Sequence, residues 1–323
     1  MAYKLDLKDK KLLYELDLNS RQTFSELAKK IKLSKNSVSY RIASLQKERI
    51  IKQFYTVIDT GKLSYINFKV YLDFEGTTPE KENEIIDFLG KKDSVTGIIY
   101  IEGKYNLCFS VSVKSVAEFD ILWKELFGKY LNHIGDRRVT LMTDITYFSK
   151  AYFINARKNE FEVSFSGAEK ADVDEKDIQI LRLLSSNSRI PIIDIAEKVD
   201  IAPKTAISRI KILEEKKVIV GYRTELDIEK IGYQEFNVEL RLHNLNEELK
   251  KDFLGYIKSN PNIVSKDDVI LGGEDMEIEI QAKDMPELRK IIEEIKQKFS
   301  TIIQNYSITQ LCKEHKCLFF PLT

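Results

Sequence analysis

The sequence predicts an α+β protein built from two copies of one unit, in which a helical part precedes a sheet-forming part. Residues 5–65 align without gaps with residues 173–233, and the run Asn19-Ser20-Arg21 recurs as Asn187-Ser188-Arg189. Each copy opens with apolar residues at helical spacing and continues with segments whose apolar and polar residues alternate as in strands. The chain has 323 residues, enough for about two to four domains with separate cores.

Start signals for three helices lie in the first part of each copy. Asp6 with Asp9 gives an acidic start before an apolar stripe, Thr23 with Glu26 forms a capping box, and Ser34 caps a third helix. In the second copy, proline stands at the cap of the second helix and in the first turn of the third, where its missing N–H is not needed.

The third helix of each copy, within residues 33–45 and 201–213, carries the clearest functional pattern. Apolar residues recur at positions five, nine and twelve of both segments, which places them on one buried face. The other face carries short polar and basic side chains that suit phosphates and base edges. These are Lys35, Asn36, Ser39 and Tyr40 in the first copy and Lys204, Thr205 and Ser208 in the second. Because β-branched segments follow, at 55–58 and 218–220, each copy is predicted to contain a winged helix-turn-helix.

The second part of each copy has the predicted order strand, helix, strand, strand, helix, strand, which is the ferredoxin-like βαββαβ arrangement. In the first copy these elements occupy residues 68–72, 79–91, 95–101, 107–113, 115–130 and 139–148, with a turn at Gly103. In the second copy they occupy residues 236–242, 246–259, 269–271, 276–282, 285–299 and 302–311, with a turn at Gly272-Gly273.

The predicted domains follow from this order. Helix-turn-helix units occupy residues 1–60 and 173–230, and ferredoxin-like domains occupy residues 64–153 and 233–323. Residues 154–172 are polar and are predicted to form a linker, although Phe161, Val163 and Phe165 alternate as in an edge strand.

Basic residues are concentrated locally. The chain has 51 Lys and Arg against 51 Asp and Glu, which excludes a uniformly basic coat. Residues 29–52 nevertheless hold eight bases and one acid, whereas residues 197–223 hold seven bases and four acids. Any nucleic-acid contact must come from such patches, and the patch of the first copy is the stronger.

Three cysteines are too few for a disulfide framework, and no apolar segment resembles a signal peptide or spans a bilayer. We therefore expect a cytoplasmic protein without a membrane partner. Cys312, His315 and Cys317 lack a fourth neighbouring ligand, and the two cysteines would point to opposite strand faces. The sequence thus predicts no metal site and no cofactor.

A family resemblance follows from three features. The segment at residues 33–42 has the pattern L-S-x-x-S-V-S-x-R-I, Asp59, Lys62 and Leu63 form a D-x-x-K-L hinge, and the turn at Gly103 has the form Gly-x-Tyr. In these features the sequence resembles the Lrp/AsnC, or feast/famine, transcriptional regulators, and the resemblance covers nearly the whole chain twice. It implies two family subunits fused in tandem, whose ferredoxin-like sheets pair within the chain or between chains.

The resemblance also implies double-stranded DNA as partner, with the start of the third helix in the major groove. Ser34, Lys35, Asn36, Ser39 and Tyr40 would then face DNA, as would Lys204, Thr205 and Ser208. Arg41 and Arg209 would either touch phosphate or brace the unit. Because the two faces differ, we expect an imperfect palindrome as target, with the first unit dominating affinity. The alternative is that these side chains are merely solvated.

Family members often bind an amino acid near a Gly-x-Tyr-Asp turn and a threonine on the last strand. By this resemblance, Gly103, Tyr105, Asn106 and Thr143 form one candidate effector site, and Gly273, Asp275 and Thr309 form the other. Asn106 and Met276 stand where the pattern has aspartate. We therefore expect a weak or altered response to an amino acid or other small metabolite, at one site per chain. Alternatively, the glycines only form hairpins.

The leading interpretation is a DNA-binding regulator without catalysis. A second interpretation is an enzyme, because some fused proteins of this architecture resemble siroheme decarboxylases, which use histidines in the ferredoxin-like domains. No histidine lies near either hairpin turn in the sequence. A third is an interaction module whose helix-turn-helix units no longer bind DNA.

Overall fold

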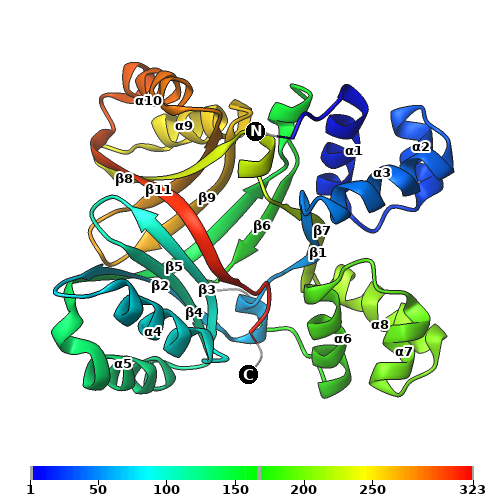
Figure 1. Ribbon diagram of the computed structural model, residues 1–323, viewed down its shortest axis with the longest axis horizontal. Coiled ribbons are helices and arrows are strands. Elements are labelled where there is room, and N and C mark those ends of the chain that lie inside the picture. Colours follow the sequence, from blue (N-terminus) through cyan, green and yellow to red (C-terminus); the bar gives the residue numbers. More distant parts are fainter. Residues whose placement is uncertain (1–2, 157, 166–168, 322–323) are drawn as a thin grey trace.

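The computed structural model describes residues 3–156, 158–165 and 169–321. Its two helical units lie side by side on one flank of a closed β-barrel (Figure 1). The units consist of α1 (Leu7–Leu18), α2 (Phe24–Ile31) and α3 (Lys35–Lys47), and of α6 (Glu175–Ser186), α7 (Ile192–Val199) and α8 (Pro203–Glu215). The predicted caps are present, since Asp6, Thr23 and Ser34 each accept a hydrogen bond from a backbone N–H in the first turn of the helix that follows.

The barrel contains both ferredoxin-like sheets, and the predicted α+β fold is confirmed. Its strands are β2 (Ile66–Phe74), β3 (Val95–Glu102), β4 (Leu107–Val113), β5 (Ile134–Phe148), β8 (Gln234–Leu242), β9 (Ile263–Ile270), β10 (Met276–Ala282) and β11 (Ile303–Cys317). They follow the order β2-β4-β3-β11-β8-β10-β9-β5, and β5 also pairs with β2, which closes the ring. The last strand of each copy therefore joins the other copy, β5 to β9 and β11 to β3. The sheets pair within the chain as a pseudo-dimer.

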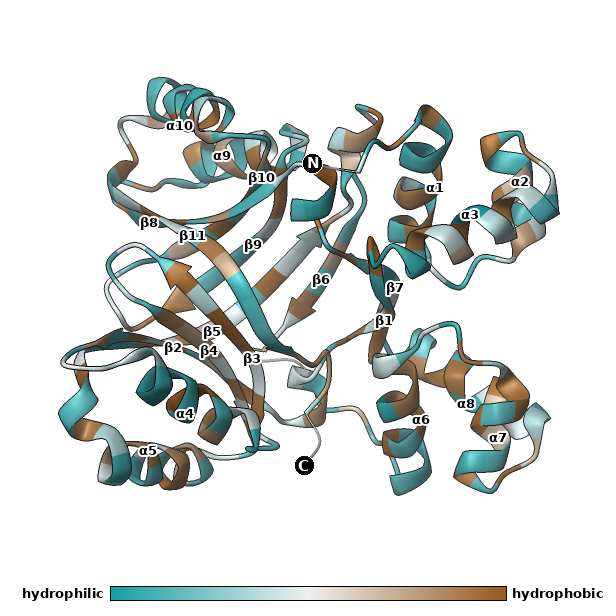
Figure 2. Cartoon of the chain, in the orientation of Figure 1, coloured by the Kyte–Doolittle hydropathy of each residue, from teal (hydrophilic) through white to brown (hydrophobic). Residues whose placement is uncertain are grey.

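Helices cover the outside of the barrel. They are α4 (Pro79–Gly90) and α5 (Val116–Tyr130) in the first copy and α9 (Glu247–Ser259) and α10 (Met285–Phe299) in the second. Hydrophobic and hydrophilic residues alternate along these helices in Figure 2, and their apolar sides pack on the outward strand residues. Phe109 and Phe253 are among the largest fully buried side chains of these two cores. The inward strand residues are left to face one another across the barrel.

A two-stranded ribbon connects the barrel to the helical units. The strand after each third helix, β1 (Ile51–Ile58) or β7 (Ile219–Leu226), pairs antiparallel with its counterpart from the other copy. Thr56 Oγ1 donates to Leu184 O at 2.8 Å, and Thr224 Oγ1 donates to Leu16 O at 3.0 Å. Each ribbon strand is thus bonded to the helical unit of the other copy, so that the two units form one body with the ribbon.

Several predicted boundaries differ from the structure. The alternation noted at Phe161 and Val163 within the predicted linker does form an edge strand, β6 (Glu160–Ser164), which pairs with β5. Residues 157 and 166–168 of that linker lie outside the described residues. Strands β5, β9 and β11 are longer than predicted, because barrel closure gives each of them partners on both sides. Cys312, His315 and Cys317 all belong to β11 or end it. Within the described residues, no helix is long and apolar enough to cross a membrane.

Candidate nucleic-acid interface

Helix α3 presents a polar face to solvent because its apolar stripe is fully used by the core. Val38 is completely buried, whereas Lys35 and Asn36 are exposed and the Tyr40 side chain is 76% exposed. Ser34 accepts from Ser37 N at 3.1 Å, which fixes the start of the helix. A tyrosine left this exposed has no packing role, so it is available to an external partner. The structure brings the predicted first-copy residues to one continuous surface.

Helix α8 presents the corresponding face of the second unit. Ala206, Ile210 and Leu213 are buried, and Lys204, Thr205 and Ser208 are exposed as predicted. Ile207, which is 54% exposed, occupies the position of Ser39 and was missed because only polar side chains were considered. The 168-residue offset of the repeat would have identified it. An exposed apolar side chain on this face matches the methyl group of thymine.

Two arginines at matching positions of the repeat brace their units. Arg41 Nη1 lies 2.9 Å from Asp6 Oδ2 and 2.5 Å from Asp9 Oδ1. Arg209 makes the same two contacts in the second unit, with Asp174 and Asp177. In both units the third helix is thereby tied to the N-terminus of the first. Of the two roles expected for these arginines, the structure displays the bracing role.

Both units use some of their basic side chains in contacts within the chain. In the first unit, Lys30 pairs with Glu15, Arg41 is engaged as above and Lys52 pairs with Glu314. The side chains of its other five bases make no ion pair or hydrogen bond within the described part of the chain. They are Lys29, Lys32, Lys35, Lys47 and Arg49. In the second unit, Arg223 is only 2% exposed and is held by Asp17, so it adds nothing to the surface charge.

The hairpin turns correct the alignment of the two predicted effector sites. Asn106 Oδ1 accepts from Phe74 N at 2.7 Å, and Asp275 Oδ2 accepts from Leu242 N, also at 2.7 Å. Asp275, rather than Met276, is therefore the counterpart of Asn106. The second turn aligns through Gly272 instead of Gly273, and Glu274 takes the place of Tyr105. Two adjacent glycines made the register ambiguous in the sequence.

The threonine assignment also changes. Strands β5 and β11 each have 15 residues and begin at Ile134 and Ile303, so Thr309 corresponds to Thr140. Each turn glycine faces the threonine of the other copy, because a Cβ on Gly103 would meet Thr309 Oγ1 at 3.2 Å and one on Gly272 would meet Thr140 Cγ2 at 2.6 Å. Thr143 instead donates to Asp268 O at 3.1 Å, a contact between β5 and β9.

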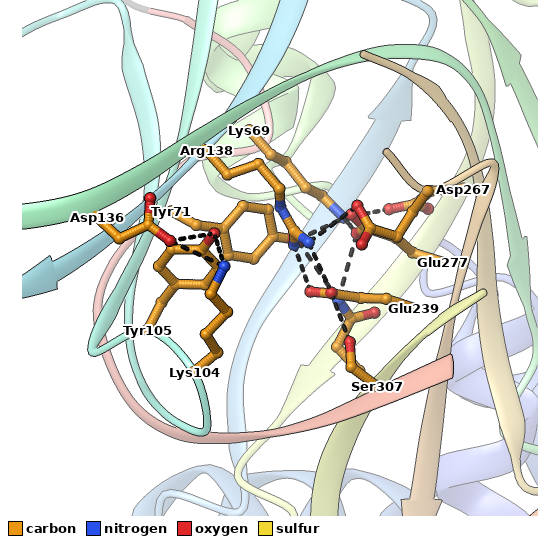
Figure 3. A network of polar contacts seen from close by, with 12 residues as sticks. Lys69, Tyr71, Lys104, Tyr105, Asp136, Arg138, Glu239, Asp267, Glu277 and Ser307 are labelled. Atoms are coloured by element: carbon orange, nitrogen blue, oxygen red, sulfur yellow. Dashed lines mark hydrogen bonds and ion pairs between the residues drawn. The ribbon is translucent and has the colours of Figure 1, made fainter. Parts of the chain in front are cut away.

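Charged side chains fill the barrel interior and join the two copies (Figure 3). Arg138 donates to both carboxylate oxygens of Glu239, at 2.9 and 2.6 Å, and its guanidinium lies over the Tyr71 ring. Lys69 pairs with Asp267 and with Glu277, the latter at 2.7 Å. In these pairs between copies, the first copy supplies the cations and the second supplies the carboxylates. This arrangement favours pairing of unlike copies, because two like copies would bring like charges together.

Comparison with known proteins agrees with the geometry. A family model described as winged helix-turn-helix DNA-binding matches residues 5–52 and 173–220. The proline dehydrogenase transcriptional activator of Rhodobacter capsulatus is 32% identical over 123 residues, which cover 38% of this chain and 79% of that protein. The HTH-type transcriptional regulator AldR of Mycolicibacterium smegmatis is 32% identical over 126 residues, or 38% of this chain and 72% of that protein. The chain belongs to the Lrp/AsnC family of transcriptional regulators.

As an Lrp/AsnC regulator, the chain carries the family unit twice. The crystal structure of the siroheme decarboxylase NirDL aligns with both copies at once, covering 96% of this chain and 92% of that chain with a TM-score of 0.63. Sequence identity in that alignment is 13%, so the likeness concerns the fold alone. The tandem arrangement of a regulator-type fold is therefore shared with a protein named for a different function.

Proposed function

We propose that this regulator binds an imperfect DNA palindrome, with α3 on one half-site and α8 on the other. The ribbon supports this, because each of its strands is bonded to the helical unit of the other copy in the same way. Both units also lie on the same flank of the barrel (Figure 1). Two linked reading units give one chain the valency that other DNA-binding proteins obtain by dimerising.

The halves of the target differ because the helix faces differ. Asn36 suits adenine, Lys35 and Lys204 suit guanine or phosphate, and Ile207 suits a thymine methyl group. Each good base contact discriminates by about 1–3 kcal/mol. The first unit then reads its half-site mainly through hydrogen bonds, and the second relies more on shape and apolar contact.

The observation that carries the proposal is a difference in basic side chains that have no partner among the described residues. There are five in residues 29–52 and three, Lys198, Lys204 and Lys217, in residues 197–223. Unpaired exposed cations release counterions when they meet phosphate, whereas buried Arg223 cannot do so. We therefore propose that the first unit supplies the larger share of affinity.

A matched pair of double variants tests this ranking. Binding to a duplex selected by the protein from a random library is measured by fluorescence anisotropy for Lys35→Ala/Asn36→Ala and for Lys204→Ala/Thr205→Ala. Lys251→Ala on exposed α9 is the control, since it lies on the barrel side of the molecule. The first double variant is expected to lose more affinity than the second, and the control to lose none. Equal binding by the first double variant and the unaltered protein would refute the ranking.

We further propose that small effectors act at the corrected turn sites. One site comprises Gly103, Tyr105, Asn106 and Thr309, and the other comprises Gly272, Glu274, Asp275 and Thr140. The side chains of Asn106 and Asp275 are already occupied by backbone N–H groups, which supports a weak response to amino acids. Calorimetry with the twenty amino acids tests it, and tight binding at both turns would contradict it.

The likeness to NirDL supports one alternative, a decarboxylase of a tetrapyrrole. A decarboxylase substrate carries carboxylates, and these would meet the acidic side of the barrel interior. The regulator proposal is favoured for that reason. A visible absorption spectrum of protein mixed with siroheme tests the alternative. Steeply salt-dependent DNA binding would separate the regulator from a pure interaction module.

A further inference from the structure

A cavity of about 250 Å³, partly open to solvent, lies where the barrel meets the ribbon. Its walls come from the barrel strands, from β1 and from the end of the described chain at residues 317–321. Tyr55 of β1 and Phe319 stack with ring centroids 3.5 Å apart, and Met142 and Ile145 add further apolar surface. The mouth of a β-barrel is a common location for small-molecule sites.

Two acidic residues, Asp267 and Glu279, line this cavity, and neither has its full set of hydrogen-bond partners among the described residues. Asp267 is 2% exposed, and only its Oδ2 is bonded, to Lys69. Its Oδ1 has no hydrogen-bond partner among the described residues. The side chain of Glu279, on the neighbouring strand β10, makes no hydrogen bond or ion pair within the same residues. A buried carboxylate oxygen without a partner costs free energy, which a ligand donor would recover.

The local charge is negative. Lys69 is the inner cation, and Glu277 already neutralises it while also accepting from Tyr71 at 2.9 Å. Asp267 and Glu279 therefore add up to two uncompensated negative charges when they ionise. Two further charged residues at the rim are engaged elsewhere, since Glu314 pairs with Lys52 and Lys316 donates to backbone carbonyls.

We propose that the cavity binds a small organic cation, a primary amine with an apolar body. The ammonium group would donate to Asp267 Oδ1 and to Glu279, and the body would lie against Tyr55, Met142 and Ile145. A metal ion is disfavoured because the described residues contain no cluster of three potential metal ligands. A zwitterionic amino acid is disfavoured because its carboxylate would share the cavity with the two acids.

A ligand bound in the cavity would influence the DNA-binding units through β1. Residues Tyr55 to Ile58 form one wall of the cavity, and Thr56 is bonded to the C-terminal end of α6. A ligand that fits one ribbon position better than another shifts the balance between them, and with it the placement of the two recognition helices. This second step rests on the proposed DNA-binding function, whereas ligand binding itself does not.

Calorimetry with three molecules that share one aromatic body tests the site. Phenethylamine is the cation, 2-phenylethanol is its neutral isostere and phenylalanine is the zwitterion. Saturable binding of the amine is expected, with affinity at least about tenfold above that of the alcohol or the amino acid, because only the amine brings a charged donor without a negative charge. No saturable heat with the amine, or equal or tighter binding of either other compound, would overturn the proposal.

Glu279→Gln is the decisive variant because the Glu279 side chain has no partner to lose within the described chain. It should weaken amine binding about tenfold, while Glu293→Gln, on the exposed side of α10, should leave it unchanged. Asp267→Asn should also weaken amine binding, and circular dichroism checks that this variant folds. Unchanged amine affinity in folded Glu279→Gln would place the ligand elsewhere and overturn the assignment.

The pH profile gives an independent readout. Burial raises the pKa of Asp267 to about 7, against the pull of Lys69 on β2 and with the repulsion of Glu279 and Glu277 on β10. Tyr147 on β5 also faces this group. Amine affinity should therefore rise from pH 5.5 to pH 8, and binding at pH 6 should release protons. A flat profile would contradict ionisation of Asp267 on binding.

Anisotropy with the selected DNA duplex then separates the two steps. If the amine binds and changes DNA affinity, and Glu279→Gln abolishes only that change, coupling is supported. If the amine binds without changing DNA affinity, the coupling is wrong. If the protein binds no DNA at all, the proposed DNA-binding function fails while the calorimetric result still decides the cavity.

Discussion

The Asp17 carboxylate on α1 holds the guanidinium of Arg223 on β7, with both carboxylate oxygens 2.9 Å from Nη2 and both side chains almost fully buried. Asp17 also accepts from the Lys150 N–H at 2.7 Å. The counterparts of this pair in the other copy are Ser185 and Tyr55, so the contact exists once per chain. It ties the first helical unit to the ribbon strand of the second copy.

Removing the charge of Asp17 should therefore destabilise the chain. Asp17→Asn leaves Arg223 buried without a counter-ion, and we expect a loss of about 3–5 kcal/mol in the free energy of unfolding. Urea denaturation measures it, with Asp194→Asn on exposed α7 as control. Burial opposes ionisation of Asp17, but Arg223 and Lys150 outweigh it and lower the pKa. This stabilisation is present above the unfolded pKa and should vanish as pH falls through the folded value. If Asp17→Asn lowers the free energy of unfolding no more than Asp194→Asn does, the Asp17–Arg223 pair is not needed for stability.

Glu235, a partly exposed acid on β8, should have the opposite pH dependence. Burial, with repulsion from Glu279, raises the pKa of Glu235 to about 8, well above its ordinary value of 4.5. Between these values the folded state binds more protons than the unfolded state, so stability falls as pH rises. In Glu235→Gln, the free energy of unfolding should therefore fall less steeply with pH, by up to about 1.4 kcal/mol per pH unit. Denaturation midpoints between pH 5 and pH 8 measure the slope. Identical slopes in variant and parent would exclude this role.

Charge complementarity between the copies is tested by exchanging one pair. Arg138→Glu places a second carboxylate against Glu239, in a position where the arginine is 10% and the glutamate 4% exposed. We expect a loss of several kcal/mol in unfolding free energy. The double variant Arg138→Glu/Glu239→Arg should recover part of it, because the attraction is restored with reversed polarity. Additive losses without recovery would mean that the pair contributes only through local packing.

Gly272 should tolerate no side chain. Its φ is +75°, and a Cβ would lie 2.6 Å from Thr140 Cγ2. Gly272→Ala is expected to lower the unfolding free energy by more than about 1 kcal/mol, since the backbone is strained as well as crowded. Gly255, within α9, has nothing within 4 Å of the position that a Cβ would take, so Gly255→Ala should instead stabilise by about 0.5–1 kcal/mol. Equal effects at the two glycines would argue against the close approach of the turn to β5.

The sequence predicted what is local and repeated. Caps such as Ser34, the apolar stripe through Val38, and the order of strands and helices depend on neighbouring residues, and each appeared as expected. The partner of each strand depends on distant residues. For that reason the ribbon pairing of β1 with β7 and the pairing of β5 with β9 of the other copy were not predicted.

The site was predicted in part for related reasons. Polar residues of α3 and α8 could be placed from helical periodicity alone. The burial of Arg223 could not be predicted in this way, because its partner Asp17 lies 206 residues away in the sequence. The register of the second turn required the bond from Leu242 N to Asp275. Inward-facing charges on alternate strand positions, such as Glu277 and Glu279, were a signal that could have indicated a polar barrel interior.

Hydroxyl-radical footprinting on the selected duplex tests the central claim most directly. If both helical units read DNA, one chain should protect two patches on one face of the duplex, separated by a whole number of helical turns. Lys35→Ala/Asn36→Ala should erase one patch, and Lys204→Ala/Thr205→Ala should erase the other. A single patch that both double variants weaken equally, or no protection at all, would contradict two unequal reading units in one polypeptide.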